Sequence, residues 1–551
     1  MLKQFLWVIS AGAVLILFGL FIRFYDGKLL SDFFYADTGR LLLRFVYSDS
    51  LILSGVFLGV WFCVHSWLKN LKQSLKLTSN SLWILFFAIF LWIRCFYLAH
   101  AWFLAGSLGF PLDDAWIHAV YAKNFSQTLT LGFVSGVTDA GTSSPLWSIL
   151  LAAGANLDVA MIWNVHFWSN LCWLGAFFTF FLLAKQLLQD FNWVFLVVLI
   201  ISVEPMLVWS SLAGLETGLF SFLIYLALYF YGRSETMKWL AAVLAGLSGL
   251  VRAEGWILVG VFLVIDVVRK RTNTRDSLLR LGLSVLIILP WIAHNYMANG
   301  TPLPQTFYAK SSSFTIITIM ETLRTTLVVM LSPGLWVFTI LLPLAIWGWL
   351  HHKKGFGLIL PMIVTMLLYW CSIAVTIGIF ANNHRYIHPF IPVFILFVLT
   401  GFYYSLDKMR ILRYWLTTGV VLVVFMTGIL SSVIYGYGVK NIEEQQVVMA
   451  VWVRDNVPDG VTVAANDVGV LGYYSEHEIY DLCGLVGEGG VVMRPNATWD
   501  DLISRGIHWA AIYPEWFPKL SADPAAIKVA EFNVDRAVTV GGKTAVVFYH
   551  P

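Results

Sequence analysis

The sequence predicts an α-helical membrane protein that crosses the bilayer many times and ends in an α/β domain. Of its 551 residues, 59% are hydrophobic and only 12% are charged, and the mean hydropathy is +0.76. Soluble chains carry about 25% charged residues, so this sequence has too little polar surface to cover several soluble domains. The composition also excludes intrinsic disorder, which requires low hydrophobicity and high charge.

Apolar segments long enough to cross a bilayer of about 30 Å recur along the chain. We expect about thirteen membrane-spanning helices, over residues 4–22, 50–68, 82–105, 160–184, 191–213, 215–232, 237–251, 254–269, 278–296, 325–350, 356–380, 387–404 and 412–434. No small-residue cleavage site follows the first of these segments, so we expect an uncleaved anchor helix there.

Basic residues in the short loops predict the orientation of these helices. They fall in alternate loops, at Lys69, Lys72 and Lys76; Lys185; Arg233 and Lys238; Arg269, Lys270, Arg271 and Arg275; His351 to Lys354; and Lys408, Arg410 and Arg413. Cytoplasmic loops are enriched in Lys and Arg. We therefore expect a cytoplasmic N-terminus and, after thirteen spans, an extracytoplasmic C-terminus. The net charge of +3 gives no reason to expect a nucleic-acid partner.

The chain divides into three parts. We expect accessory membrane helices in residues 1–80, a membrane core with a long outer loop (106–157) in residues 81–436, and an extracytoplasmic α/β domain in residues 437–551. Within that domain, the pattern predicts a helix over 443–456, a capped helix over 498–506, strands over 461–465, 479–482 and 508–513, and a terminal hairpin over 538–549.

Two adjacent aspartates, Asp113 and Asp114, begin a predicted short helix (113–125) that we expect to lie on the membrane surface. Aspartate is favoured at a helix N-cap, where it contributes about 1 kcal/mol. One aspartate suffices for a cap, so we predict that one carboxylate takes a proton from an acceptor hydroxyl while the other orients that acceptor or binds a cation. Capping alone is the alternative. His118, one turn after Asp114, is a candidate substrate contact, and a structural role or a role that supports the aspartates is the alternative.

Further charged residues lie beside apolar segments, where each costs about 2.5–3.5 kcal/mol. They occupy three outer turns: Glu204 with Glu216, Arg252 with Glu254, and His384 with Arg385. The two spans that meet at Arg252 and Glu254 have about fifteen residues each and reach roughly 22 Å, which is less than the hydrocarbon thickness. Their turn is therefore predicted to lie below the outer surface and to form the wall of a pocket.

These turns supply candidates for substrate binding. Arg252 and Arg385 are candidate contacts for an anionic phosphate, because guanidinium geometry suits that group. His384 and Lys310 are further candidate phosphate contacts. Neutralisation by nearby glutamates, or snorkelling of Lys310 to the interface, is the structural alternative. Candidate contacts for the rest of the substrate are Glu216, Glu254, Trp147 and Tyr308. A loop-to-helix start explains the segment 142–147 equally well.

Several short motifs resemble those of the GT-C glycosyltransferases that use polyprenyl-phosphate donors in bacterial membranes. They are Leu112 to Ile117, Tyr121 to Asn124, Gly141 to Trp147, Gly214 to Thr217, Arg252 to Gly255, Pro302 to Lys310, Arg385-Tyr386, Asn466 to Gly469 and Asp481 to Val486. The resemblance covers roughly residues 82–551. Within this superfamily the chain looks most like the terminal arabinofuranosyltransferases of actinobacterial cell walls and their relatives.

The resemblance implies an inverting transfer of a sugar, with arabinofuranose as one candidate, from a polyprenyl-phosphate donor to an extracytoplasmic glycan or glycolipid. It implies that Asp113 or Asp114 is the base and that Arg385 and Lys310 lie near the donor phosphate. Ala253 departs from the pattern, because relatives often carry proline at that position. The identities of the sugar and the acceptor do not follow from these motifs. The sequence contains no cofactor motif, and a divalent metal remains an option.

The main alternative is a transporter or flippase for a lipid-linked saccharide. Transporters usually place their site near the bilayer midplane between inverted repeats. This sequence shows no internal repeat, and its charged turns favour one leaflet. A third hypothesis is a non-catalytic scaffold whose outer domain binds glycan.

Overall fold

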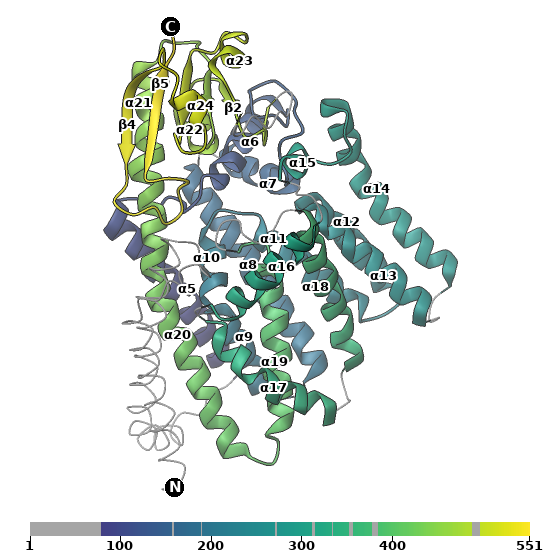
Figure 1. Ribbon diagram of the computed structural model, residues 1–551. Helices are drawn as coiled ribbons and strands as arrows, with labels where there is room; N and C mark the ends of the chain where they lie inside the picture. The colour runs from purple at the N-terminus through teal and green to yellow at the C-terminus, as the bar shows by residue number, and fades with distance from the viewer. Residues whose placement is uncertain are drawn as a thin grey trace.

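The computed structural model describes residues 79–156, 159–188, 190–269, 273–310, 315–332, 334–351, 356–376, 384–487 and 496–551. The predicted spans 4–22 and 50–68 lie outside the described residues. Most of the described chain is helical, and a small sheet lies at one end of the helices (Figure 1).

The helices begin and end close to the predicted limits of the apolar segments. They are α5 (Ser79–Ala105), α6 (Asp114–Thr128), α7 (Pro145–Ala155), α8 (Met161–Leu187), α9 (Phe191–Ser202), α10 (Pro205–Leu212), α11 (Thr217–Tyr231), α12 (Met237–Val251), α13 (Trp256–Arg269), α14 (Thr274–Asn299), α15 (Gln305–Lys310), α16 (Ile316–Met330), α17 (Trp336–His351), α18 (Phe356–Thr376), α19 (Ile391–Ser405) and α20 (Arg410–Asn441). Short 3-10 turns, η2 (Ala253–Gly255) and η3 (His388–Phe390), precede α13 and α19.

Among the described residues, five helical stretches are long and apolar enough to cross a membrane, and a sixth results if α9 and α10 form one bent span. The five stretches are Leu82–Ala105, Met161–Leu187, Thr274–Asn299, His388–Ser405 and Ile411–Asn456. This is the organisation of a multi-pass membrane protein. The total of thirteen spans remains a prediction.

Two predicted spans are interrupted. Residues 191–213 form α9 and α10, which meet at an angle of 58°, because the Glu204 side chain accepts a hydrogen bond from the Leu207 amide and starts a new helix. Residues 325–350 contain the end of α16 and all but the last residue of α17. Gly334 between them has φ +91°, a left-handed conformation that ends a helix and that glycine adopts readily.

The last apolar helix extends into the C-terminal domain. α20 passes through a π-helical turn, η4 (Ile442–Val447), into α21 (Val448–Asn456) without a break. The amide of Gln445, in that turn, donates hydrogen bonds to three carbonyl oxygens of the domain. The helix predicted at 443–456 is therefore the upper end of the last membrane helix, and it connects the core directly to the domain (Figure 1).

The C-terminal domain contains a five-stranded mixed sheet. Its elements are β1 (Val463–Ala465), α22 (Gly469–Tyr474), β2 (Ile479–Asp481), α23 (Trp499–Ile503), β3 (Trp509–Ile512), α24 (Pro518–Ser521), β4 (Ile527–Asn533) and β5 (Thr544–Tyr549). The strand order is β2-β1-β3-β5-β4, with β1 parallel to β2 and β3, and the other pairs antiparallel. The predicted hairpin at 538–549 is wrong, because β5 pairs with the earlier strand β4.

Helix α6, predicted to lie on the membrane surface, lies between the helical core and the C-terminal domain. Its apolar side chains Trp116, Ala119 and Ala122 are fully buried in protein. The Trp116 ring lies 4.9 Å from the rings of both Tyr473 and Tyr474 in α22, measured between centroids. A helix that is buried on most of its sides contacts protein all round. Its apolar residues therefore do not indicate which side would face lipid.

Candidate active site

A cavity of about 340 Å³ opens where the ends of the core helices meet the C-terminal domain. Residues of α6, the η2 turn, α15 and the loop after β2 contribute to its wall. The lining residues with polar or charged side chains are Asp114, His118, Thr142, Ser143, Glu216, Arg252, Glu254, Trp256, Thr306, Lys310, Ser372, Arg385 and Tyr386. The cavity therefore gathers seven of the eleven site candidates that the sequence supplied.

One side of the cavity joins a carboxylate to two cations. Asp114 Oδ2 accepts a hydrogen bond from Arg385 Nη2 and lies 3.8 Å from Lys310 Nζ. The second terminal nitrogen of Arg385, Nη1, is buried and has no hydrogen-bond partner among the described residues. Burial acts to raise the pKa of Asp114, but the charges of Arg385 and Lys310 outweigh it and hold this pKa well below its usual range. With these two cations beside it, the Asp114 carboxyl group is ionised.

A second charged cluster forms around Glu216. Arg252 Nη1 donates to Glu216 Oε1 at 2.8 Å and Arg252 Nη2 to Glu254 Oε1 at 3.3 Å. His118 Nε2 lies 3.3 Å from Glu216 Oε2. The neutralisation proposed as the structural alternative for Arg252 is therefore present.

Tyr386 connects the two charged clusters. Its ring centroid lies 4.6 Å from the guanidinium carbon of Arg252 and 5.2 Å from that of Arg385. Cations over an aromatic face are attracted by the ring quadrupole. Sequence reasoning quoted Tyr386 in a motif without assigning it to the site, because an aromatic residue beside an apolar span has no distinctive pattern.

Two short helices, α12 and α13, form the part of the cavity wall that contains Arg252. α12 and α13 have 15 and 14 residues, as predicted, and η2 joins them at the cavity. A Cβ on Gly255 would lie 2.5 Å from the backbone of Ser248, so this turn requires glycine.

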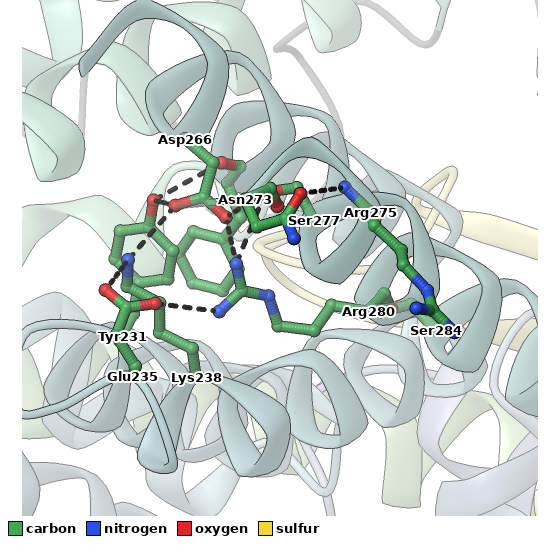
Figure 2. A network of polar contacts seen from close by, with 10 residues as sticks. Tyr231, Glu235, Lys238, Asp266, Asn273, Arg275, Ser277, Arg280 and Ser284 are labelled. Atoms are coloured by element: carbon green, nitrogen blue, oxygen red, sulfur yellow. Dashed lines mark hydrogen bonds and ion pairs between the residues drawn. The ribbon is translucent and has the colours of Figure 1, made fainter. Parts of the chain in front are cut away.

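Figure 2 shows what holds the opposite ends of these two helices. Asp266 of α13 accepts hydrogen bonds from Tyr231 at 2.7 Å, Lys238 at 3.2 Å and Arg280 at 2.8 Å, which belong to α11, α12 and α14. The α12–α13 pair is therefore fixed by buried ion pairs at both ends.

Four of the predicted site residues do not line the cavity. Trp147 is fully buried within α7, and Tyr308 is 43% exposed. Tyr308 points away because α15 directs its neighbours Phe307 and Lys310 inward. His384 does not line the cavity either; it has φ +54° and forms the bend that precedes Arg385.

Asp113 is the fourth predicted site residue that does not line the cavity. Its side chain forms no cap hydrogen bond with α6, so the capping alternative is wrong for Asp113. Its Oδ2 and Oδ1 instead accept hydrogen bonds from the amides of Gly469, at 2.8 Å, and Val470, at 2.7 Å, in the C-terminal domain. Burial, with the charge of Asp467 added, raises the pKa of Asp113.

The loop after β2 forms the roof of the cavity. The Asp481 carboxylate accepts hydrogen bonds from the amides of Cys483, Leu485 and Val486, and this folds the loop back. Burial raises the pKa of Asp481 to about 6. Leu485 lines the cavity, and the Gln305 amide donates to the carbonyl of Gly484 at 3.2 Å. The C-terminal domain thus forms part of the wall.

The residues that the structure describes contain no group of three or more His, Cys, Asp or Glu side chains that would hold a metal ion.

Comparison with known proteins identifies the fold. A family model described as a domain of unknown function (DUF8728) matches residues 440–549. A search of curated proteins finds no match. Among solved structures, ArnT from Cupriavidus metallidurans bound to undecaprenyl phosphate matches with a TM-score of 0.55 and 15% identity, over 86% of this chain and 98% of ArnT. Its apo form matches with a TM-score of 0.58 and 13% identity over the same shares.

ArnT belongs to the GT-C superfamily. This chain has a GT-C-like fold. An oligosaccharyltransferase from Archaeoglobus fulgidus matches with a TM-score of 0.48 and 11% identity, over 77% of this chain and 68% of that one. The two ArnT structures confirm the predicted resemblance to the superfamily for the fold alone, and the likeness to arabinofuranosyltransferases remains a prediction.

Proposed function

We propose that the protein is a membrane glycosyltransferase that moves a sugar from a polyprenyl-phosphate donor to a hydroxyl group of an extracytoplasmic glycan or glycolipid. One observation carries the proposal: a carboxylate, Asp114, and two cations, Arg385 and Lys310, meet in a cavity of a GT-C-like fold. ArnT binds undecaprenyl phosphate, which supports a lipid phosphate as the donor group. Arabinofuranose is the first donor sugar to test.

The donor phosphate is assigned to Arg385 and Lys310. Arg385 Nη1 has no partner among the described residues and is available to an anion. The apolar lining residues Ile257 and Phe307, with the indole ring of Trp256, suit the first isoprenoid units of the lipid. When the bond between the anomeric carbon and the phosphate oxygen breaks, negative charge grows on that oxygen, and fixed cations stabilise such charge strongly in a partly dry site.

Asp114 is assigned as the base. It takes the proton of the acceptor hydroxyl as the acceptor oxygen bonds to the anomeric carbon, opposite the departing phosphate, so the configuration inverts. The products are the glycoside and polyprenyl phosphate. Glu216, Glu254 and the hydroxyl of Thr306 line the same cavity and are candidate partners for sugar hydroxyls.

Donor binding has a consequence for Asp114. Arg385 and Lys310 lower the pKa of Asp114, and a carboxylate that is paired with two cations is a weak base. A donor phosphate competes for the same two cations. As they turn to the phosphate, their effect on Asp114 weakens and its pKa rises. In this proposal the donor binds first and activates the base.

The proposed exchange predicts a difference between two pH profiles. A base must be deprotonated, so activity falls as the pH drops through its pKa. The profile of kcat/KM for the donor reports the free enzyme, in which the pKa of Asp114 is lowered, and that of kcat reports the donor complex. The acid limb of kcat is therefore expected at higher pH than that of kcat/KM, measured as initial transfer rates across the acidic range.

Arg385→Ala is the matched variant for this measurement. Loss of one cation is expected to move the acid limb of kcat/KM for the donor to higher pH. The difference in pH between this limb and the acid limb of kcat should therefore become smaller. It should also raise the donor KM about 10-fold to 100-fold, since a hydrogen bond to a charged group contributes about 1.5–3 kcal/mol. If the acid limbs of kcat and kcat/KM fall at the same pH in the unmodified enzyme, then Arg385 and Lys310 do not turn from Asp114 to the donor phosphate as proposed.

The function itself is tested with purified protein in detergent micelles. We expect it to convert at least one donor from a panel of polyprenyl-phosphate sugars, detected by mass spectrometry as released polyprenyl phosphate and glycosylated acceptor. A flippase has no compartments to act between in micelles and leaves the donor intact. Transport of unaltered donor in proteoliposomes, without product in micelles, would favour the flippase hypothesis.

A further inference from the structure

We propose that the C-terminal domain holds the active-site carboxylate in place, and that Asp113 is the positioning residue through which it does so. The proposal concerns the domain matched over residues 440–549, and its kinetic part rests on the proposed function. The domain is expected to fix the start of α6, from which Asp114 enters the cavity.

The first support is the contact at Asp113. Both carboxylate oxygens are occupied by backbone amides of the domain, those of Gly469 and Val470. The approach is close: a Cβ on Gly469 would lie 2.3 Å from the Asp113 carbonyl oxygen. No other residue type fits at position 469 without displacing α6.

The second support is that these two amides are themselves fixed within the domain. Asn466 Oδ1 accepts a hydrogen bond from the Tyr513 amide at 3.0 Å, just after β3. Asp467 Oδ2 accepts one from Gln446 at 2.6 Å, in the π-helical turn η4. The segment 466–469, one of the motifs that carry the resemblance, therefore joins the sheet, the last membrane helix and α6.

The third support is the geometry of α6. Successive residues of a helix differ in direction by about 100°. Asp113 contacts the domain, whereas its neighbour Asp114 contacts Arg385 and lines the cavity. Further along the same helix, Trp116 lies between Phe110 of the core, at 5.3 Å, and Tyr473 of the domain. A displacement of the domain would therefore move Asp114 directly.

Small displacements of a catalytic group have large effects, because a misplacement of about 1 Å can cost about 100-fold in rate. Arg385 and Lys310 are not attached to α6, so donor binding is expected to survive such a displacement. Removing the Asp113 contact should thus lower kcat about 100-fold and leave the donor KM close to that of the unmodified protein.

The test compares Asp113→Ala and the milder Asp113→Asn with Ser107→Ala in the full-length protein. Ser107 donates to Glu443 at 2.8 Å, so this control removes another contact between core and domain without touching α6. Hydrogen exchange is measured at the amides of Gly469 and Val470, and at those of Trp116 and Ile117, whose bonds to the Asp113 carbonyl begin α6. Steady-state kinetics give kcat and the donor KM.

We expect faster exchange at both pairs of amides and a lower kcat in the two Asp113 variants, and neither effect in Ser107→Ala. Unchanged exchange at Trp116 and Ile117 in Asp113→Ala would overturn the proposal whatever the kinetics show. So would an Asp113→Asn variant that loses all activity with normal exchange, since Asp113 would then act in the chemistry. If the unmodified protein transfers no sugar, the proposed function fails, and the exchange data still decide the positioning role.

Discussion

Asp114→Asn is expected to lower the rate of sugar transfer about 10²-fold to 10⁴-fold, the usual contribution of a positioned general base. An amide has the shape of the carboxylate but cannot take the proton of the acceptor hydroxyl. The loss should appear in kcat, measured with saturating donor, and the thermal unfolding temperature in detergent should stay close to that of the unmodified protein.

Donor binding distinguishes a base from a phosphate-binding residue at this position. Asp114 pairs with Arg385 and lies 3.8 Å from Lys310, so it competes with a phosphate for both cations. The variant should therefore bind donor at least as tightly as the unmodified protein. Asp500→Asn, an exposed position in α23, is the matched control and should keep full activity. Full transfer by Asp114→Asn would exclude Asp114 as the base.

The position of the site follows from the sequence because charges beside apolar segments are costly and must find partners. Glu216, Arg252, Arg385 and Lys310 all line one cavity for this reason. The sequence did not show which of the two aspartates faces the cavity. That depends on Gly469, whose amide binds Asp113 across more than 350 residues of chain, and no local pattern reports such a contact.

The helical fold was predictable from hydropathy, which sums over many residues and is insensitive to a single interruption. It located the apolar segment 191–213 but not the bend before Pro205, which depends on one side-chain bond from Glu204. In the sheet, β4 was missed because it is an edge strand. Most of its side chains are exposed, so it lacks the alternation of buried and exposed residues that marks a strand with one buried face.

Arg252→Ala is expected to produce the largest loss of stability. Arg252 is 5% exposed and Glu216 7% exposed, so removing the guanidinium leaves a buried carboxylate without its partner. Breaking a buried ion pair in this way typically costs about 3–5 kcal/mol. The loss is measured as a lower thermal unfolding temperature in detergent. Arg454→Ala is the control, because the Arg454–Asp455 pair is well exposed and its loss should leave that temperature unchanged.

The cause of that loss can be separated from the loss of packing. If the penalty comes from the unpaired charge on Glu216, then adding Glu216→Gln to Arg252→Ala should recover part of the unfolding temperature, since the buried group is then neutral. If Arg252 stabilises mainly through its contact with Tyr386, whose ring lies 4.6 Å from the guanidinium carbon, the second substitution recovers nothing. A higher unfolding temperature in the double variant than in Arg252→Ala would show that neutralisation of Glu216 by Arg252 stabilises this wall of the cavity. The positions of Glu216 and Glu254, which are proposed to contact sugar hydroxyls, would then depend on the same arginine.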